Sequence, residues 1–288
     1  MTRMKVLIVY AHPDPSSFCA ALKGAAAEAI HKAGHQAIIS DLYAEGFNPV
    51  AGRHDFLAAA DAERFHYQSE QLHAAQTLGF CGEISREQGR VEAANAIVFL
   101  FPLWWGGPPA ILKGWIDRVY AFGFAYGVGP YGGSQWGKRF GEGALEGRRA
   151  MVATTVGGRM SHYGPRGVGG AIDDLLWPIQ HGVLFYPGMT VVPPVVFYEV
   201  NRPTPEAVES MADDYVRRLL DIATAEPIAF RRQNGGEYDD VQVLKPEFGA
   251  GLTGHAAHQG GTPFVSNVFP GSPGDYTPRH IAPSSRDG

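Results

Sequence analysis

The chain alternates short apolar runs with longer segments of mixed apolar and polar residues over its first two thirds. Five runs rich in apolar and β-branched residues have the pattern of strands buried in a sheet, and they cover residues 5–11, 36–41, 96–102, 149–155 and 190–198. Between and after them, helical patterns cover residues 17–33, 85–95, 109–122, 170–184 and 205–224. Strands that alternate with helices form a parallel sheet covered on both faces, with right-handed crossovers. We therefore predict an α/β fold with a doubly wound, five-stranded parallel sheet.

Local residues sharpen the predicted boundaries of these elements. Ser16 or Ser17 can cap the first helix, because a hydroxyl oxygen accepts from the free N–H groups of a helix start. Pro178 falls inside a helical pattern and predicts a kink there. Pro193 and Pro194 interrupt the fifth strand, which predicts an edge or a bulge, since proline has no N–H for the strand ladder.

The last part of the chain has a different composition. Of the 62 residues from 227 to 288, 17 are Gly or Pro, against 41 of the 226 residues before them, and no periodicity is visible. We therefore divide the chain into a main domain over residues 1–226 and an extension over residues 227–288. We expect the extension to pack on the main domain or on a second subunit, with an end that is free to move.

Composition and charge exclude several classes of protein. The net charge is −5 and 45% of the residues are hydrophobic, which gives no bulk signal for nucleic acid or for disorder. No run of 18 apolar residues occurs, and the N-terminal pattern lacks the layout of a secretory leader. Cys19 and Cys81 are too few for a disulfide framework or a metal knuckle, so we expect buried thiols in a reducing cytoplasm.

Some motifs in the chain mislead. Residues 127–132 satisfy G-x-G-x-x-G, but no strand precedes them and no helix clearly follows. Residues 132–139 nearly fit a phosphate-binding loop, but Arg139 stands where that loop needs Ser or Thr for Mg²⁺. For His255 and His258, in the extension, we expect a packing or solvated role rather than a metal site.

Candidate chemistry gathers in three loops that follow predicted strands. They are residues 12–18 (HPDPSSF), 102–107 (PLWWGG) and 155–158 (TVGG). Parallel sheets bind ligands outside the carboxyl ends of their strands. The first loop leads into a helix N-terminus, which favours a phosphate; the second offers Trp104 and Trp105 for stacking; the third offers backbone N–H groups without side-chain bulk. From the residues alone, plain helix capping and two indoles that plug the core stay open as alternatives.

Several stretches of the sequence then resemble one known family. They are LIVYAHPDPSSF (7–18), SDLYAEGFNP (40–49), FPLWWGGPPAILKGWIDRV (101–119), FAYG (124–127), LLWPIQHG (175–182) and KPEFGAGLTGHAAH (245–258). The chain is similar, over about residues 4–260, to the NAD(P)H:quinone oxidoreductases of the DT-diaphorase type. That resemblance implies a flavodoxin-like fold, a homodimer with its active site at the interface, and a flavoprotein that carries FAD rather than FMN. It also implies ping-pong hydride transfer from NADH or NADPH to a quinone.

The resemblance further assigns residues to the cofactor and substrate sites. Those matching the family's flavin site are His12, Ser17, Phe18, Cys19, His66, Pro102, Leu103, Trp104, Trp105, Gly106, Asp117, Thr155, Val156, Gly157, Gly158 and Tyr163. Those matching its substrate pocket are Trp105, Gly106, Phe124, Tyr126, Val128 and Tyr186, with Tyr126 supplied by the second subunit. The chain departs from the family at several of these positions: Cys19 replaces an Asn, Trp104 a Gln and Gly106 a Phe, while His66 replaces a Gln and Asp117 a Glu.

The resemblance places catalysis at Tyr163, the match of a tyrosine beside flavin N1 and O2. The family's catalytic histidine falls on Gly169 in this chain, and His162 is the candidate to replace it. Gly106 and Val128 lack the aromatic bulk of the family, which predicts a wide substrate site. An azo, nitro or biosynthetic acceptor, a flavodoxin-like electron carrier, and a redox-sensing subunit of a potassium-efflux system therefore stay open as alternatives.

Overall fold

The computed structural model describes residues 3–132, 135–201 and 203–260. A parallel sheet runs through its centre in the order β2-β1-β3-β6-β7, and β8 also pairs with β6. The first four strands of this sheet, in chain order, are β1 (Lys5–Tyr10), β2 (Gln36–Asp41), β3 (Ala96–Pro102) and β6 (Arg149–Thr155). Their bounds confirm the predicted strands to within one residue.

The fifth strand position is divided between two short strands. β7 (Thr190–Val191) pairs with the start of β6, and β8 (Val195–Phe197) pairs with its end. Pro193 and Pro194 lie in the gap, as expected from their missing N–H groups. Counted as one position, the strands have the order 2-1-3-4-5, which is the flavodoxin-like arrangement.

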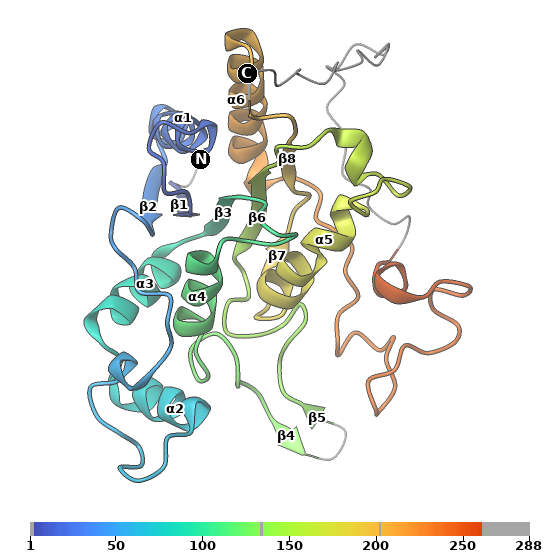
Figure 1. Ribbon diagram of the computed structural model, residues 1–288. Helices are drawn as coiled ribbons and strands as arrows, with labels where there is room; N and C mark the ends of the chain where they lie inside the picture. The colour runs from blue at the N-terminus through green and yellow to red at the C-terminus, as the bar shows by residue number, and fades with distance from the viewer. Residues whose placement is uncertain (1–2, 133–134, 202, 261–288) are drawn as a thin grey trace, which may run out of the picture.

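Helices cover both faces of the sheet (Figure 1). One face carries α1 (Phe18–Lys32) and α6 (Pro205–Leu220), and the other carries α3 (Gly82–Ala93), α4 (Ala110–Val119) and α5 (Ile172–Ile179). The alternation of side chains along β1 shows why both faces need cover: Val6 and Ile8 pack toward α1 and α6, while Leu7 and Val9 pack toward the opposite helices.

The observed helices differ from the predicted ones in two places. The helix α2 (Tyr67–Thr77) was not predicted, because its sequence YQSEQLHAAQT is polar and lacks an apolar stripe. The helix expected over residues 170–184 is α5 followed by one π-helical segment, Gln180–Phe185. Pro178 lies inside α5 and cannot donate the usual hydrogen bond, which explains why the regular pattern changes just after it.

The start of α1 settles which serine caps it. Ser17 Oγ accepts from the N–H of Ala20 at 3.1 Å. Ser16 instead donates its hydroxyl to Asp14 at 2.7 Å, so its side chain belongs to the loop. This cap fixes where the first loop ends and where the free N–H groups of the helix begin.

The described part of the extension, residues 227–260, packs on the main domain. Ile228 and Phe230 are buried, and the N–H of Ile228 donates to the carbonyl of Val191 at 2.8 Å. The segment doubles back on itself, because the N–H of Arg231 donates to the carbonyl of His258 at 3.0 Å. Figure 1 shows it beside α5. The mobile end predicted for the extension lies outside the described residues.

The structure also bears on the glycine motif, the two cysteines and membrane-spanning helices. The glycine motif at 127–132 leads into a hairpin of β4 (Tyr131–Gly132) and β5 (Gln135–Trp136), so it has no dinucleotide-binding context. Cys19 is buried and Cys81 half-buried, and both are free thiols. Among the described residues, no helix is long and apolar enough to cross a membrane.

Candidate active site

A cavity of about 660 Å³ opens at the carboxyl ends of the central strands. We call it the carboxyl-end cavity. It brings together nine of the predicted flavin residues: His12, Ser17, Phe18, Cys19, Pro102, Leu103, Trp104, Thr155 and Gly157. These residues come from all three loops identified in the sequence. The expectation that a ligand site lies outside the carboxyl ends of the strands therefore agrees with an observed cavity, on which the three loops converge.

The first wall is the loop between β1 and α1. The N–H of Asp14 donates to His12 Nδ1 at 3.0 Å, and the N–H of Ser16 donates to Asp14 Oδ1 at 2.8 Å. The hydrogen bond from the Ser16 hydroxyl, and after it the bond from the Ser16 N–H, lower the pKa of the Asp14 carboxyl. The loop is thus held in place, and it presents the start of α1, where Phe18 and Cys19 carry the N–H groups that a helix leaves without internal partners. A phosphate fits such a helix start.

The second wall is a tight turn after β3. The N–H of Trp104 donates to the carbonyl of Gly107 at 2.9 Å, and the reverse bond measures 3.0 Å. Between them, Trp105 has φ 51° and Gly106 has φ 74°, the signs of a type I′ turn. A non-glycine residue in this left-handed region is strained, and such strain gathers at functional sites.

This turn excludes the idea that the two indoles plug the core. The Trp105 side chain is fully exposed, and Trp104 is 41% exposed. The Trp104 ring centroid lies 6.2 Å from that of His12, so these two side chains approach each other across the cavity mouth. Both indoles are available to a ligand.

The third wall follows β6. Val156 contributes neither side chain nor N–H to the cavity, because its side chain is buried and its N–H donates to the carbonyl of Phe197 at 2.7 Å. Gly157 and Gly158 follow without side chains. A Cβ at Gly158 would lie 3.0 Å from Tyr163 Cε2, so the tyrosine ring rests directly on this glycine. The small residues at this turn therefore allow Tyr163 to approach the loop.

Gly169, the position to which the resemblance assigns the family histidine, lies at the same corner. A Cβ at Gly169 would lie 3.1 Å from Tyr163 Cε1, so position 169 borders the Tyr163 ring. His162 is exposed, and its Nδ1 lies 3.7 Å from the place of a Cβ on Gly158. The side chain of His162 is thus close to the corner that Gly169 leaves without one. The replacement of the family histidine by His162 stays a prediction.

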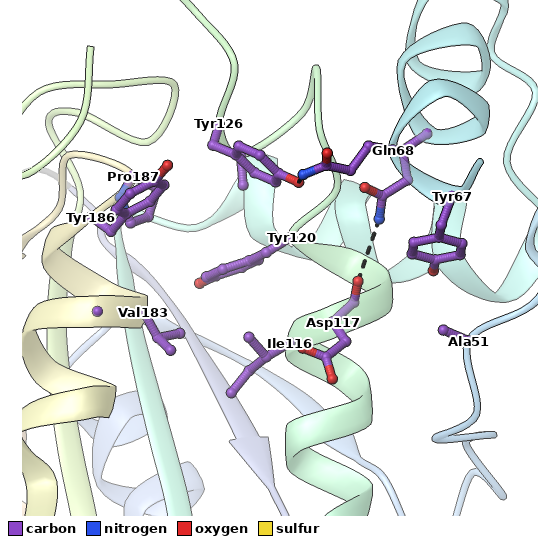
Figure 2. Close-up of a pocket in the computed structure, with 13 residues that line it drawn as sticks. Ala51, Tyr67, Gln68, Ile116, Asp117, Tyr120, Tyr126, Val183, Tyr186 and Pro187 are labelled. Carbon is purple, nitrogen blue, oxygen red and sulfur yellow. Dashed lines mark hydrogen bonds between the residues drawn. The ribbon is translucent and has the colours of Figure 1, made fainter. Parts of the chain in front are cut away.

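A second cavity, of about 480 Å³, lies between α2, α4 and the π-helical segment (Figure 2). We call it the tyrosine cavity. Gln68 Nε2 donates to Tyr126 Oη at 3.2 Å, and the ring centroids of Tyr126 and Tyr186 are 6.2 Å apart. Asp117 lines the same space and pairs with Lys113 at 2.6 Å.

Within one chain, several predicted site residues lie away from the carboxyl-end cavity. The tyrosine cavity shares no lining residue with it, so Asp117, Tyr126 and Tyr186 are not brought to the predicted flavin residues. His66 caps α2 and lines a depression with Phe122. Four predicted substrate residues line neither of the two larger cavities: Trp105, Gly106, Phe124 and Val128. The predicted flavin residues Val156, Gly158 and Tyr163 are also outside both linings, and they lie beside the lining residues Thr155 and Gly157 or against Gly158.

Sequence reasoning missed one wall and one neighbour of the site. Asn201, Pro203 and Val208 line the carboxyl-end cavity from the loop after β8 and the start of α6. Tyr198 lies just after β8 and packs on Tyr163, with ring centroids 6.0 Å apart. These residues could have been predicted from the sequence. They follow the carboxyl end of the fifth strand, and parallel sheets bind ligands outside the carboxyl ends of all their strands.

Comparison with known proteins agrees with this architecture. The sequence pattern of the flavodoxin-like fold family matches residues 4–219. The chain belongs to this family.

Members with known names extend the likeness. The chain is similar to the ribosyldihydronicotinamide dehydrogenase-like protein of Penicillium crustosum, 41% identical over 82% of this chain and 87% of that one. It is similar to NAD(P)H dehydrogenase [quinone] 1 of Rattus norvegicus, 36% identical over 80% of this chain and 81% of that one. Among solved structures, a putative quinone reductase of Klebsiella pneumoniae superposes with a TM-score of 0.86 at 44% identity, covering 89% of this chain and 99% of that one. The likeness thus covers most of this chain and most of each of these relatives.

Proposed function

We propose that this protein is an NAD(P)H quinone-reductase-like oxidoreductase, and that it works through a flavin held in the carboxyl-end cavity. The observation that carries the proposal is the convergence of a helix start, an exposed aromatic turn and a glycine turn on one cavity. The named relatives support the same activity, because one is named a dehydrogenase-like protein and another an NAD(P)H dehydrogenase [quinone], at 41% and 36% identity over 82% and 80% of this chain.

The residues of the cavity fit a flavin. The free N–H groups of α1 suit its phosphate, and the Trp104 indole suits the face of its ring. Gly157 and Gly158 allow Asn201 and Tyr163 to lie directly against this turn, since a Cβ on either glycine would meet one of them within 3.0 Å. When bound, the flavin would supply hydride chemistry between NAD(P)H and the acceptor. The protein's part is to position the ring and to stabilise negative charge at its polar edge, and we assign the second task to the Tyr163 hydroxyl.

We propose FAD rather than FMN as the flavin. The cavity continues beyond the three predicted loops to Asn201, Pro203 and Val208, which supports a ligand longer than a mononucleotide. Chromatography of the flavin released from the purified protein tests this proposal. FAD is the expected result, and FMN would overturn the role given to the far end of the cavity.

We further propose that the active site is completed in a homodimer. Tyr126 and Tyr186 lie apart from the carboxyl-end cavity in one chain, so a second copy is needed to bring them to it. Sedimentation of the flavin-loaded protein should give the mass of two chains. A monomer with full quinone reductase activity would contradict this arrangement.

The acceptor we favour is a quinone, with a wide entrance to the site. A Cβ at Gly106 would lie 3.7 Å from Leu175 Cδ2, which is an ordinary contact, and the glycine itself adds no aromatic bulk to the mouth. Gly106→Phe should raise the KM for bulky quinones and spare small ones. Because Gly106 has φ 74°, any side chain there strains the turn, and Gly106→Ala is the matched control for that strain.

A panel of acceptors tests the activity itself. We expect the purified protein to oxidise NAD(P)H with quinones at higher kcat/KM than with azo dyes or nitroaromatics. A preference for an azo or nitro compound would replace the quinone as acceptor while leaving the flavin site in place. A protein that does not oxidise NAD(P)H at all would instead favour an electron carrier.

A further inference from the structure

A third cavity, of about 340 Å³, lies between the main domain and the extension. We call it the extension cavity. Its walls include Phe140, Trp177 and His181 from the main domain, and Tyr238, Gln242 and His258 from the extension. It shares no lining residue with the carboxyl-end cavity or the tyrosine cavity. Within one chain, a ligand here would therefore be separate from both other cavities.

Four aromatic rings form a continuous stack along this cavity. His181 stacks on Phe140 with ring centroids 4.8 Å apart, and Trp177 stacks on His181 at 4.4 Å. His255 from the extension covers the other face of Trp177 at 4.5 Å, with an interplanar angle of 7°. Because the rings cover one another's faces, the inner ones present their edges to the cavity. Ring edges carry partial positive charge and attract the face of another aromatic ring.

One polar group in this cavity has no partner. Gln242 Oε1 accepts from Arg139 Nη2 at 3.0 Å. Since a guanidinium only donates, this bond fixes the orientation of the amide and turns its NH₂ group the other way. Gln242 Nε2 is buried, and the described residues give it no hydrogen-bond partner. Leaving a buried donor unpaired costs free energy, so the group is suited to an acceptor supplied from outside.

The backbone of Gln242 adds a second, independent sign. Its φ is 64°, in the left-handed region that long side chains rarely adopt. Arg139 also donates to Gln233 Oε1 at 2.7 Å, so one guanidinium holds two glutamines of the extension at the cavity. Residues 132–139, which do not fit the phosphate-binding loop, thus contribute Arg139, which orients the Gln242 amide at this cavity.

Among the described residues, the one arginine that lines the cavity is paired, and Arg139 is not among the lining residues. Arg231 pairs with Glu237 and also donates to the carbonyl of Ala257 at 2.9 Å. Burial lowers the pKa of His181 to about 4, and burial also lowers the pKa of His258, so both rings are neutral at pH 7. An ionic ligand would find no unpaired charge among these groups and would lose its hydration.

We propose that the extension cavity binds an uncharged aromatic molecule of one or two rings that carries a hydrogen-bond acceptor, such as a carbonyl, on its edge. The volume suits a ligand of that size. The ring faces meet the edges of the aromatic stack, and the acceptor takes the hydrogen bond from Gln242.

Calorimetry on the full-length, flavin-loaded protein with three probes tests this proposal. Benzamide has the ring and the carbonyl, toluene has the ring alone, and benzoate has a charge. We expect benzamide to bind more tightly than either of the others. Equal binding of toluene would overturn the role of Gln242, and tighter binding of benzoate would overturn the requirement for an uncharged ligand. No binding of benzamide would overturn the proposal as a whole.

The variant Gln242→Glu tests whether benzamide binds in the extension cavity. The glutamate keeps the size of the side chain and the bond from Arg139 but has no N–H to donate, so benzamide affinity should fall about tenfold. Gln36→Glu, on the exposed start of β2, is the matched control and should leave the affinity unchanged. Equal loss in both variants, or no loss in Gln242→Glu, would place benzamide elsewhere and contradict the proposal.

A second measurement does not depend on any variant. In the wild-type protein, benzamide should shift the imidazole NMR signals of His181 and His258 and spare that of His31, which lies on α1. Shifts confined to other histidines would also overturn the assignment. Quinone turnover should stay unchanged in Gln242→Glu, which separates failure of this proposal from failure of the proposed function.

Discussion

The carboxyl-end cavity and the extension cavity are built in different ways. Three walls of the first are loops that directly follow β1, β3 and β6, so each wall is a short contiguous piece of sequence. The second joins segments far apart in the chain: the bond from Arg139 to Gln242 spans 103 positions. The first depends on the ends of a parallel sheet, whereas the second depends on how an aperiodic segment packs. Substitutions in the loops after the strands should therefore affect the carboxyl-end cavity alone, and substitutions in the extension should affect the extension cavity alone.

Tyr163→Phe should have the largest effect, and only on the carboxyl-end cavity. Loss of a single donor to developing negative charge costs about 2.7–4 kcal/mol in comparable sites, so turnover should fall at least a hundredfold. Stopped-flow measurement of NAD(P)H oxidation checks this. Tyr198→Phe keeps the ring that packs on Tyr163 and serves as control. Rates for Tyr163→Phe within threefold of wild type would remove Tyr163 from its assigned role.

Acid should act on the extension side through His181. Burial, with smaller contributions from His258 and His255, lowers its pKa from 6.5 to about 4. Between these values the unfolded chain binds more protons, so the stability contributed by neutral His181 is present above pH 6.5 and is lost as the pH falls toward 4. From pH 7 to pH 5 the loss should be about 2 kcal/mol.

His181→Phe isolates this contribution. The new ring keeps the stack between Phe140 and Trp177 but cannot be protonated. Urea unfolding at both pH values should show a smaller acid-dependent loss in the variant than in the wild type. The same loss in both proteins would mean that His181 does not titrate with the fold.

Trp105→Gly should stabilise the protein while it removes an exposed aromatic surface beside the carboxyl-end cavity, next to the lining residue Trp104. Relief of the left-handed conformation at Trp105 should raise the free energy of unfolding by about 1 kcal/mol, because the exposed indole has no packing to lose. Turnover should fall, since the ligand loses a stacking surface.

Leu78→Gly is the matched control for this change. Leu78 ends α2 with φ 57° and is 88% exposed, so it should gain similar stability. Its turnover should not change, because it lies in neither cavity. A loss of stability in Trp105→Gly would show that the strained turn is held by contacts that the fold needs.

Ser17→Ala should have the smallest effect. The loss of the cap of α1 should lower the free energy of unfolding by about 1 kcal/mol. Ser16→Ala removes only an exposed hydrogen bond to Asp14 and should cost a few tenths of that. Chemical denaturation of both variants measures the difference, and a reversed order would assign the cap to Ser16.

The same contrast explains how much the sequence could predict. Buried parallel strands have short apolar runs, so β2, β3 and β6 were located with their observed bounds. Their ends led to Trp104 and Gly157, because the site is contiguous with the strands that carry it. The packing role expected of His255 and His258 is confirmed by the stack on Trp177 and the contact with Tyr238.

The rest had no local signal. The polar sequence of α2 hides its helix, which is held by buried bonds such as that from Gln71 Nε2 to the carbonyl of Asp117. The pairing of Arg139 with Gln242 depends on where the extension doubles back, which no periodicity indicates. Residues such as Tyr126 belong to a cavity whose partner is another copy of the chain in our proposal.

The central claim is that a flavin lies in the carboxyl-end cavity and exchanges hydride with NAD(P)H there. An anaerobic titration of the FAD-incubated, desalted protein with NADH or NADPH, followed by its visible absorbance, tests this most directly. We expect a yellow protein that bleaches stoichiometrically and regains its colour when a quinone is added. A protein that retains no flavin, or a yellow protein that neither nucleotide bleaches, would contradict this claim.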